Sequence, residues 1–214
     1  MPDLAALLSS LDYGAVAVFG ATGALAAARR KHDIVTFAFF AAVTGVGGGT
    51  LRDLLLGTPV FWVARPAYLG VCLAAATAVW LFGWGKGREL TLTWLDGLGL
   101  AGYAVVGAVK ADSLGAPPFS AVVMGVLTAT LGGIIRDVLG GEPSVLLRRE
   151  LYVSAAVLGA GTFTLLHLAG LGPWPAGLIG FVVAFAVRAG AILFRWRLPG
   201  FPGRAPPPEQ SKEP

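Results

Sequence analysis

The sequence predicts an all-α integral membrane protein, and its composition and the length of its apolar runs carry that prediction. Hydrophobic residues make up 56% of the 214 positions and charged residues only 13%, well below the ~25% usual in soluble domains. The apolar residues fall into runs near the ~20 residues that a spanning helix needs. Seven spans are expected, at residues 4–28, 34–57, 66–84, 91–110, 117–140, 150–170 and 174–195.

The two ends of the chain complete this outline. No Lys or Arg precedes the first apolar run, so it lacks the basic start of a signal peptide and is expected to be retained as a span. Residues 1–198 are expected to form a single transmembrane domain. Residues 199–214 are rich in proline and are expected to be a disordered cytoplasmic tail.

The basic residues predict the orientation in the membrane. Eleven Lys and Arg residues at span ends fall on one side if the N-terminus is outside, and only Arg65 and Lys110 fall on the other. Because cytoplasmic loops carry an excess of Lys and Arg, the N-terminus is expected outside and the C-terminus in the cytoplasm. This clustering at span ends also argues against a nucleic-acid partner. Arg188 lies inside the last span and is expected to snorkel toward the inner face.

A ten-residue motif occurs twice, 84 positions apart: TGVGGGTLRD at 44–53 and TATLGGIIRD at 128–137. The same offset aligns Asp12 with Asp96, Pro59 with Pro143 and Tyr68 with Tyr152. Each copy holds three spans, so the second copy must enter the membrane from the opposite side. We therefore expect an inverted repeat of spans 1–3 (about 4–84) and 4–6 (about 90–170), with span 7 (about 174–195) appended.

The glycines of the two motifs predict that spans 2 and 5 are broken or kinked. Glycine inside a helix costs about 1 kcal/mol relative to alanine, and broken backbone in a membrane must be buried or line water. The carbonyl groups freed there would suit a cation, although glycines at such spacing also serve as close helix contacts. Thr44 and Thr128 precede the glycines and either face the ion or bond back into their own helix. The glycines are Gly47, Gly48, Gly49, Gly132 and Gly133.

Each motif also ends in an Arg-Asp pair, and ionisable residues at membrane depth usually mark an ion or substrate pathway. Adjacent side chains point about 100° apart on a helix, so the Arg and Asp of one motif are not expected to neutralise each other. We therefore expect cross-pairing between the copies, Arg52 with Asp137 and Arg136 with Asp53. This clamp would hold spans 2 and 5 together, and a purely structural role for it is the alternative.

Asp12 and Asp96 open spans 1 and 4 at equivalent positions. They either concentrate cations at the two mouths of a pathway or cap their helices. The single Cys72 excludes an intramolecular disulfide and a cysteine-based metal cluster. No catalytic motif is present, so we expect neither an enzyme nor a bound metal or cofactor.

The paired glycine and Arg-Asp motifs, with Asp12, Asp96, Pro59 and Pro143, resemble the prokaryotic members of the trimeric intracellular cation channel family. The resemblance implies a homotrimer with seven spans and one potassium-conducting pore in each subunit, lined by spans 2 and 5 at the glycines. It also implies membrane lipids as partners. A compact chain rich in Ala, Gly and Arg is typical of a prokaryotic member, so the plasma membrane is the expected location.

The function expected from the sequence is therefore a channel permeable to monovalent cations such as K⁺ or Na⁺. The second copy has fewer glycines than the first, so the two halves of the pore are expected to differ. A secondary transporter of a small amino acid such as glycine, using the same repeat, is the first alternative. A trimeric scaffold that transports nothing is the second.

Overall fold

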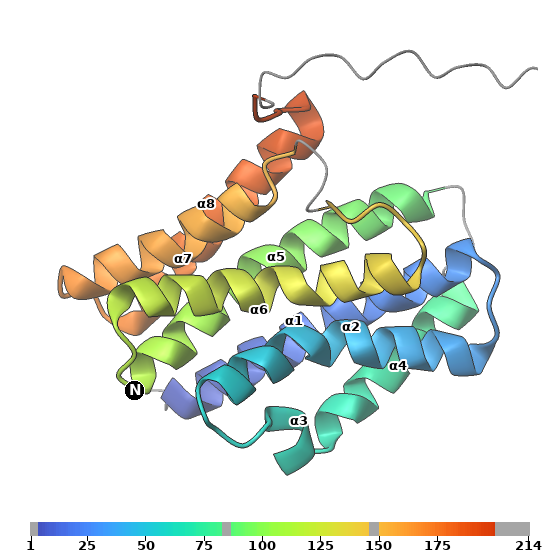
Figure 1. The fold of residues 1–214 in the computed structure, drawn as a ribbon, viewed down its shortest axis with the longest axis horizontal. Helices are drawn as coiled ribbons and strands as arrows, with labels where there is room; N and C mark the ends of the chain where they lie inside the picture. Colours follow the sequence, from blue (N-terminus) through green and yellow to red (C-terminus); the bar gives the residue numbers. More distant parts are fainter. Residues whose placement is uncertain (1–3, 83–86, 146–149, 200–214) are drawn as a thin grey trace, which may run out of the picture.

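The computed structural model describes residues 4–82, 87–145 and 150–199, and these are almost entirely helical (Figure 1). Two apolar helices of 16 residues, α4 (Ala67–Phe82) and α7 (Val153–Leu168), and one short helix, α3 (Phe61–Ala64), accompany the longer ones. Among the described residues, five helices are long and apolar enough to cross a membrane, namely α1 (Leu4–Arg29), α2 (Ile34–Leu55), α5 (Arg88–Ser113), α6 (Pro118–Leu139) and α8 (Pro173–Phe194).

A helix lies in each of the seven expected ranges, and only α3 was not predicted. The expected tail lies outside the described residues from 200 onward. The helices of 16 residues are about 24 Å long, shorter than the ~30 Å apolar core of a bilayer. The count of seven spans therefore stays a prediction.

Local sequence sets where the helices begin and end. Asp33 caps α2 by accepting a hydrogen bond from the Thr36 amide at 2.8 Å, and this bond lowers the pKa of the Asp33 carboxyl. Both α2 and α6 end in the same turn, in which Gly57 and Gly141 adopt φ of +65° and +64°. Because L-residues with a side chain are strained at such angles, glycine suits this helix end.

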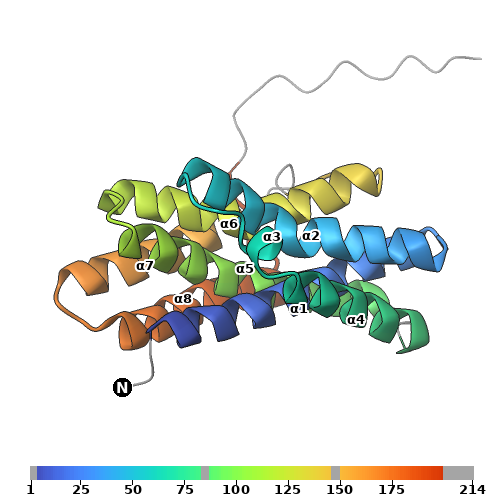
Figure 2. The ribbon, with the colours of Figure 1, turned by 90° about the horizontal axis from the view of Figure 1, so that it is seen from below.

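The helices pack in one pattern that occurs twice. α1 contacts α2 and α4 as α5 contacts α6 and α7, and α2 contacts α4 as α6 contacts α7. The two halves meet where α1 packs on α5 and α2 on α6, while α8 packs on α5 and α7. Figures 1 and 2 show α4 at one side of the bundle and α7 and α8 at the other.

The expected interruption of the second and fifth spans is wrong. Residues 34–55 and 118–139 each form one helix that runs through the glycine motifs, so no run of carbonyl groups is freed there. Packing against neighbouring helices outweighs the low helix propensity of glycine. A bend of either helix axis at these residues stays a prediction.

Candidate ion pathway

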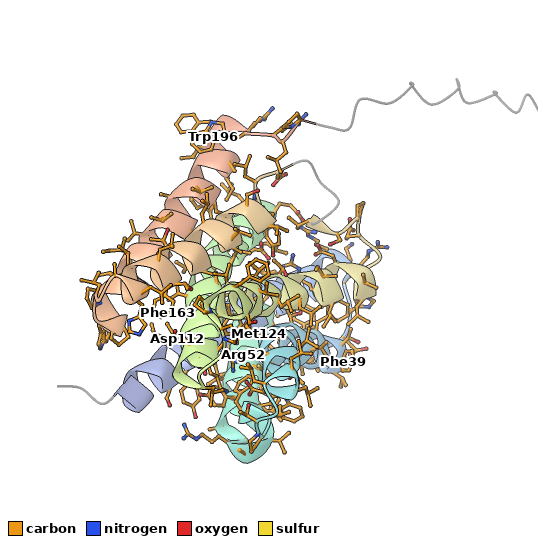
Figure 3. The ribbon with its side chains drawn as sticks, turned by 60° about the vertical axis from the view of Figure 1, so that its left-hand side comes forward. Phe39, Arg52, Asp112, Met124, Phe163 and Trp196 are labelled. Atoms are coloured by element: carbon orange, nitrogen blue, oxygen red, sulfur yellow. The ribbon has the colours of Figure 1, made fainter. Side chains whose placement is uncertain are left out.

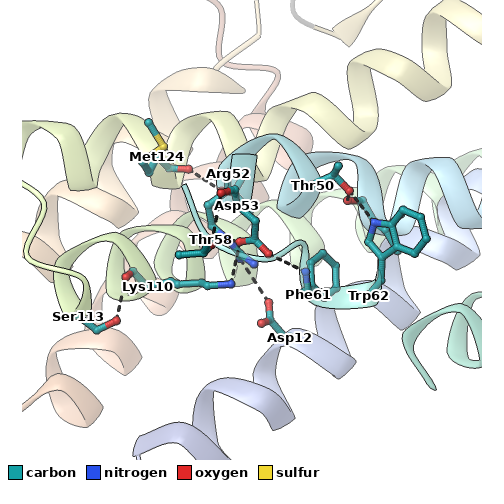
Figure 4. A network of polar contacts seen from close by, with 12 residues as sticks. Asp12, Thr50, Arg52, Asp53, Thr58, Phe61, Trp62, Lys110, Ser113 and Met124 are labelled. Atoms are coloured by element: carbon teal, nitrogen blue, oxygen red, sulfur yellow. Dashed lines mark hydrogen bonds and ion pairs between the residues drawn. The ribbon is translucent and has the colours of Figure 1, made fainter. Parts of the chain in front are cut away.

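Four ionisable side chains from α1, α2 and α5 meet where the first half packs on α5; we call them the first cluster (Figure 4). Arg52 Nε donates to Asp53 Oδ1 at 2.8 Å, and Arg52 Nη1 lies 3.5 Å from Asp12 Oδ1. Lys110 Nζ donates to the same Asp53 Oδ1 at 2.7 Å. The other carboxylate oxygen of Asp53 accepts from the Phe61 amide at 2.9 Å. Two carboxylates and two cations leave the first cluster without net charge.

The second cluster consists of Asp96 of α5 and of Arg136 and Asp137 of α6. Arg136 Nη1 donates to Asp96 Oδ1 at 2.7 Å, and its Nε and Nη2 donate to Asp137 Oδ1 at 2.9 and 2.8 Å. Asp137 Oδ2 accepts from the Val145 amide at 2.9 Å. Every one of these partners lies 84 residues after its counterpart in the first cluster. The second cluster carries one negative charge more than positive.

The expected cross-pairing of the two motifs is wrong. Each arginine binds the aspartate next to it in sequence and a second aspartate of its own half. The rule that adjacent residues diverge on a helix holds for the Cα–Cβ bonds, but the long arginine side chain curls back to its neighbour. Figure 3 shows Arg52 within the bundle, where it is fully buried, whereas Phe39 projects outward.

Asp12 and Asp96 do not cap helices, because α1 begins at Leu4 and α5 at Arg88. Both carboxylates are buried, at 7% and 2% exposure, beside the arginines of their own halves. The capping interpretation is therefore wrong. Their role at the mouths of an ion pathway stays a prediction.

The glycines bring α2 and α6 into backbone contact. A Cβ atom on Gly48 would lie 2.1 Å from the Thr128 carbonyl oxygen, and one on Gly132 would lie 2.5 Å from that of Thr44. These pairings run in opposite sequence directions, so the two helices are antiparallel at the contact. Arg52 and Arg136, each one helical turn beyond its glycine, therefore lie on opposite sides of it.

Two other glycines make room for the clusters. A Cβ on Gly49 would lie 2.6 Å from the Phe61 ring, and one on Gly133 would lie 2.8 Å from Tyr152 Oη and 3.5 Å from Asp96 Oδ1. Gly47 is less crowded, with Ile135 Cδ1 at 3.1 Å. Close contact, the alternative interpretation of these glycines, is what the geometry supports.

The hydroxyl groups of Thr44 and Thr128, the two threonines of the motifs, differ in their hydrogen bonding. Thr128 Oγ1 donates to the Met124 carbonyl at 2.6 Å, the expected bond back into its own helix. Thr44 Oγ1 is buried and has no hydrogen-bond partner among the described residues. Nearby, Tyr103 Oη donates to the Gly45 carbonyl at 2.9 Å, and its ring stacks on Phe19 with 5.3 Å between centroids. The sequence analysis did not predict this contact.

Each cluster borders a cavity. The cavity at the first cluster, about 320 Å³, is lined by Asp12, Lys110 and Arg65 together with Ser9 and Ser113. A smaller one, about 80 Å³, lies at the second cluster, and its lining includes Thr93, Asp96, Arg136, Asp137 and Glu150. The pathway residues predicted from the sequence thus lie in the α2–α6 contact or line a cavity, except Gly49 and Gly133, which pack against the cavity-lining residues Phe61 and Asp96.

Two basic side chains beside the aspartates were not placed there from the sequence: Lys110 in the first cluster, and Arg188 in the lining of the second cavity. Lys110 was counted only as a loop charge, although its ammonium reaches Asp53. Arg188 was expected to snorkel, and this is wrong. Its side chain is 3% exposed, and its Nη1 lies 3.0 Å from Glu150 Oε2, with the guanidinium carbon 5.2 Å from the centre of the Tyr152 ring. Only three-dimensional packing reveals these partners.

A comparison with known protein families also finds the duplication in this chain. A family model described as "Glycine transporter" matches the chain twice, at residues 9–84 and 93–168, again with an offset of 84. The UPF0126 inner membrane protein YadS of Escherichia coli (strain K12) is 37% identical over 195 residues, 89% of this chain and 94% of YadS. A UPF0126 membrane protein of Vibrio cholerae is 37% identical over 201 residues, 91% of this chain and 83% of the relative.

Solved structures of cation channels share the fold. The TRIC trimeric intracellular cation channel orthologue from Rhodobacter sphaeroides matches with a TM-score of 0.86 and 47% identity, over 89% of this chain and 99% of that one. A prokaryotic TRIC channel in 0.5 M KCl matches with a TM-score of 0.84 and 25% identity, over 91% and 100%. These neighbours are ion channels and not enzymes, which agrees with the expectation from the sequence.

Proposed function

Since the chain belongs to the prokaryotic trimeric intracellular cation (TRIC) channel family, we propose that it is a potassium-permeable channel for monovalent cations. One pore would lie inside each subunit. The observation that carries this proposal is the pair of cavities, each ending at a buried Asp-Arg cluster, on opposite sides of the α2–α6 contact. Ionisable groups at membrane depth are costly and are retained mainly along ion or substrate pathways.

In the proposed pathway the carboxylates of Asp12 and Asp96 attract cations into the cavities. The backbone contact at Gly48 and Gly132 closes the path between them, and opening requires α2 and α6 to move apart there. Carbonyl groups near Thr44 and Thr128 then replace part of the hydration shell of the ion. This differs from the sequence-based hypothesis, which relied on carbonyl groups freed at broken helices.

The surrounding assembly belongs to the same proposal. The chain forms a homotrimer in the plasma membrane, in contact with lipids and without a cofactor, and the permeant ion is K⁺ or Na⁺. Seven spans, an inverted repeat and an N-terminus outside the cell fit the positive-inside count and the recurrence of contacts 84 residues apart. The cation channels with the same fold support the trimer.

Single-channel recording of the purified protein in planar bilayers tests this proposal. Under a potassium chloride gradient we expect discrete currents that reverse near the potassium equilibrium potential. Reversal near the chloride potential would contradict cation selectivity. A silent bilayer containing folded protein would contradict the channel itself.

A carrier of a small zwitterion is the second candidate, and the first cavity favours it. That cavity brings the Asp12 carboxylate and the cationic ends of Lys110 and Arg65 to one space of about 320 Å³, charges that complement an amino acid. The family model described as "Glycine transporter" points the same way. Labelled glycine uptake into liposomes would then saturate, and Lys110→Met would lower it; the absence of uptake above empty liposomes would exclude this function.

A further inference from the structure

A third cavity, of about 230 Å³, lies at the end of α8 and adjoins the second cavity. Its lining includes Arg195, Trp196 and Arg197, which follow α8. Thr93 and Glu150 line both this cavity and the second one. The two spaces therefore meet at these two side chains.

Both cavities lie among helix ends that the proposed topology places on the inner side of the membrane. The lining of the second cavity includes Arg29, the last residue of α1, and Asp137, two residues before the end of α6. The third cavity lies at the end of α8, and α5 begins five residues before Thr93. A cation that moves between the cytoplasm and Asp96 would therefore pass between Thr93 and Glu150.

Glu150 is held at this junction from two sides. Its backbone forms an antiparallel bridge with Arg197, and its Oε2 accepts a hydrogen bond from Arg188 Nη1 at 3.0 Å. Trp196, which Figure 3 shows at the end of α8, fixes the bridging segment. Its ring lies against Gly190, where an added Cβ atom would be 2.5 Å from the ring. The contacts of the segment after α8 thus keep Glu150 between the two cavities.

The charges around the junction balance, so the sign of the passage depends on each pair remaining complete. The Arg188 side chain is 3% exposed, whereas that of Glu150 is 35% exposed. Salt and water screen the buried guanidinium poorly, and the carboxylate of Glu150 neutralises it. Arg195 and Arg197 are exposed, so the solvent screens their charges far better. The lining of the second cavity contains three arginines, Arg29, Arg136 and Arg188, and three carboxylates, those of Asp96, Asp137 and Glu150.

We propose that Glu150 neutralises Arg188 at the inner mouth of the ion pathway and so lets cations pass from the third cavity into the second. Without the carboxylate, a buried guanidinium would repel cations at the mouth. Without the guanidinium, the carboxylate would attract them. The inference rests on the proposed function and adds to it a pathway residue of α8 and one that precedes α7.

Potassium currents test the sign of each charge. Glu150→Gln should lower the unitary current of K⁺ entering from the side where α8 ends by about threefold or more, and Arg188→Met should raise it. The double variant, which lacks both charges, should return close to the wild-type current. A pair that only fastens α8 would instead make both single variants lower the current, and this result would overturn the proposal.

The rate at which a cysteine reacts gives a second test that needs no current. Thr93→Cys is made in a Cys72→Ala background, and the purified full chain is treated with a cationic and an anionic thiosulfonate reagent. The ratio of the cationic to the anionic rate should rise about threefold or more with Arg188→Met and fall with Glu150→Gln. Arg188→Lys, which keeps the charge, should leave the ratio unchanged. Thr91→Cys is the matched control, because this exposed residue lies about 200° around α5 from Thr93.

The control and the two measurements together separate this inference from the channel itself. The ratio at the control position should not follow the variants. An unreactive cysteine at position 93, or a ratio there that ignores the sign of the charge, would refute the role of Glu150 even if wild-type currents are present. A ratio that follows the charges in a protein without currents would refute the channel alone.

Discussion

Arg52 and Arg136 are each held by two carboxylates of their own half, one adjacent in sequence and one 40 positions earlier. The desolvation of a buried ion pair largely offsets its attraction, so the pair adds little net stability. Removing one partner is different, because it leaves an uncompensated charge at a cost of about 3–5 kcal/mol. At the scale of single residues, the arginines thus tie α2 to α1 and α6 to α5.

Double-mutant cycles test which residues are paired. Arg136→Met and Asp96→Asn should each destabilise the protein, and their combination should show a coupling of about 0.5–3 kcal/mol, as expected for residues in contact. The matched control combines Arg136→Met with Asp53→Asn, the partner in the discarded cross-clamp, and should be additive within about 0.5 kcal/mol. Unfolding by SDS in mixed micelles measures the free energies. Strong coupling in the control would reinstate the clamp between α2 and α6.

At the scale of the helices, the role of the motif glycines is to let two backbones touch. Gly48 and Gly132 lie against the carbonyl groups of the facing helix, whereas the tightest neighbour of a Cβ atom on Gly47 would be the tip of the Ile135 side chain. If the glycines serve helix contact, a side chain is therefore tolerated less well at Gly48 and Gly132 than at Gly47. A helix-breaking function would make Gly47 and Gly48 equivalent, because both weaken α2 by the same loss of propensity.

Single alanine substitutions distinguish the two roles. Gly48→Ala should destabilise by about 1–3 kcal/mol, because the new methyl group overpacks against a backbone that cannot rotate away. Gly47→Ala should cost less, since the Ile135 side chain can shift. Gly14→Ala, with no atom within 4 Å of the added carbon, should stabilise α1 by up to about 1 kcal/mol. Thermal unfolding in detergent gives the order, and equal effects of Gly47→Ala and Gly48→Ala would contradict the contact role.

The sequence predicted the helices well because apolar length and the 84-residue offset are properties of the chain itself. It predicted the residues of the clusters for the same reason, since charge in an apolar run stands out. It could not predict their pairing, which depends on how an arginine side chain bends. Nor could it distinguish a glycine break from a glycine contact, because both begin from the same weak propensity and only packing decides between them. Lys110 was missed because a charge near a helix end normally lies in water.

At the scale of the whole molecule, the two halves are built alike down to their turns. Thr58 donates its amide to the Asp53 carbonyl at 2.9 Å, and Glu142 donates to Asp137 at 2.9 Å, so α2 and α6 end in the same Schellman turn. Yet three helices that each cross the membrane lie between equivalent positions in the proposed topology. Two chemically matched turns should therefore face opposite sides of the bilayer.

Exposed prolines in these two turns, Pro59 and Pro143, test that arrangement. Pro59→Cys and Pro143→Cys are made separately in a Cys72→Ala background and treated with a maleimide that cannot cross membranes. With the N-terminus outside, the second span ends outside and the fifth ends inside. Pro59→Cys should react in intact cells, and Pro143→Cys only after permeabilisation. The reverse pattern would keep the inverted repeat and overturn the orientation, whereas labelling of both variants from one side would overturn the inversion itself.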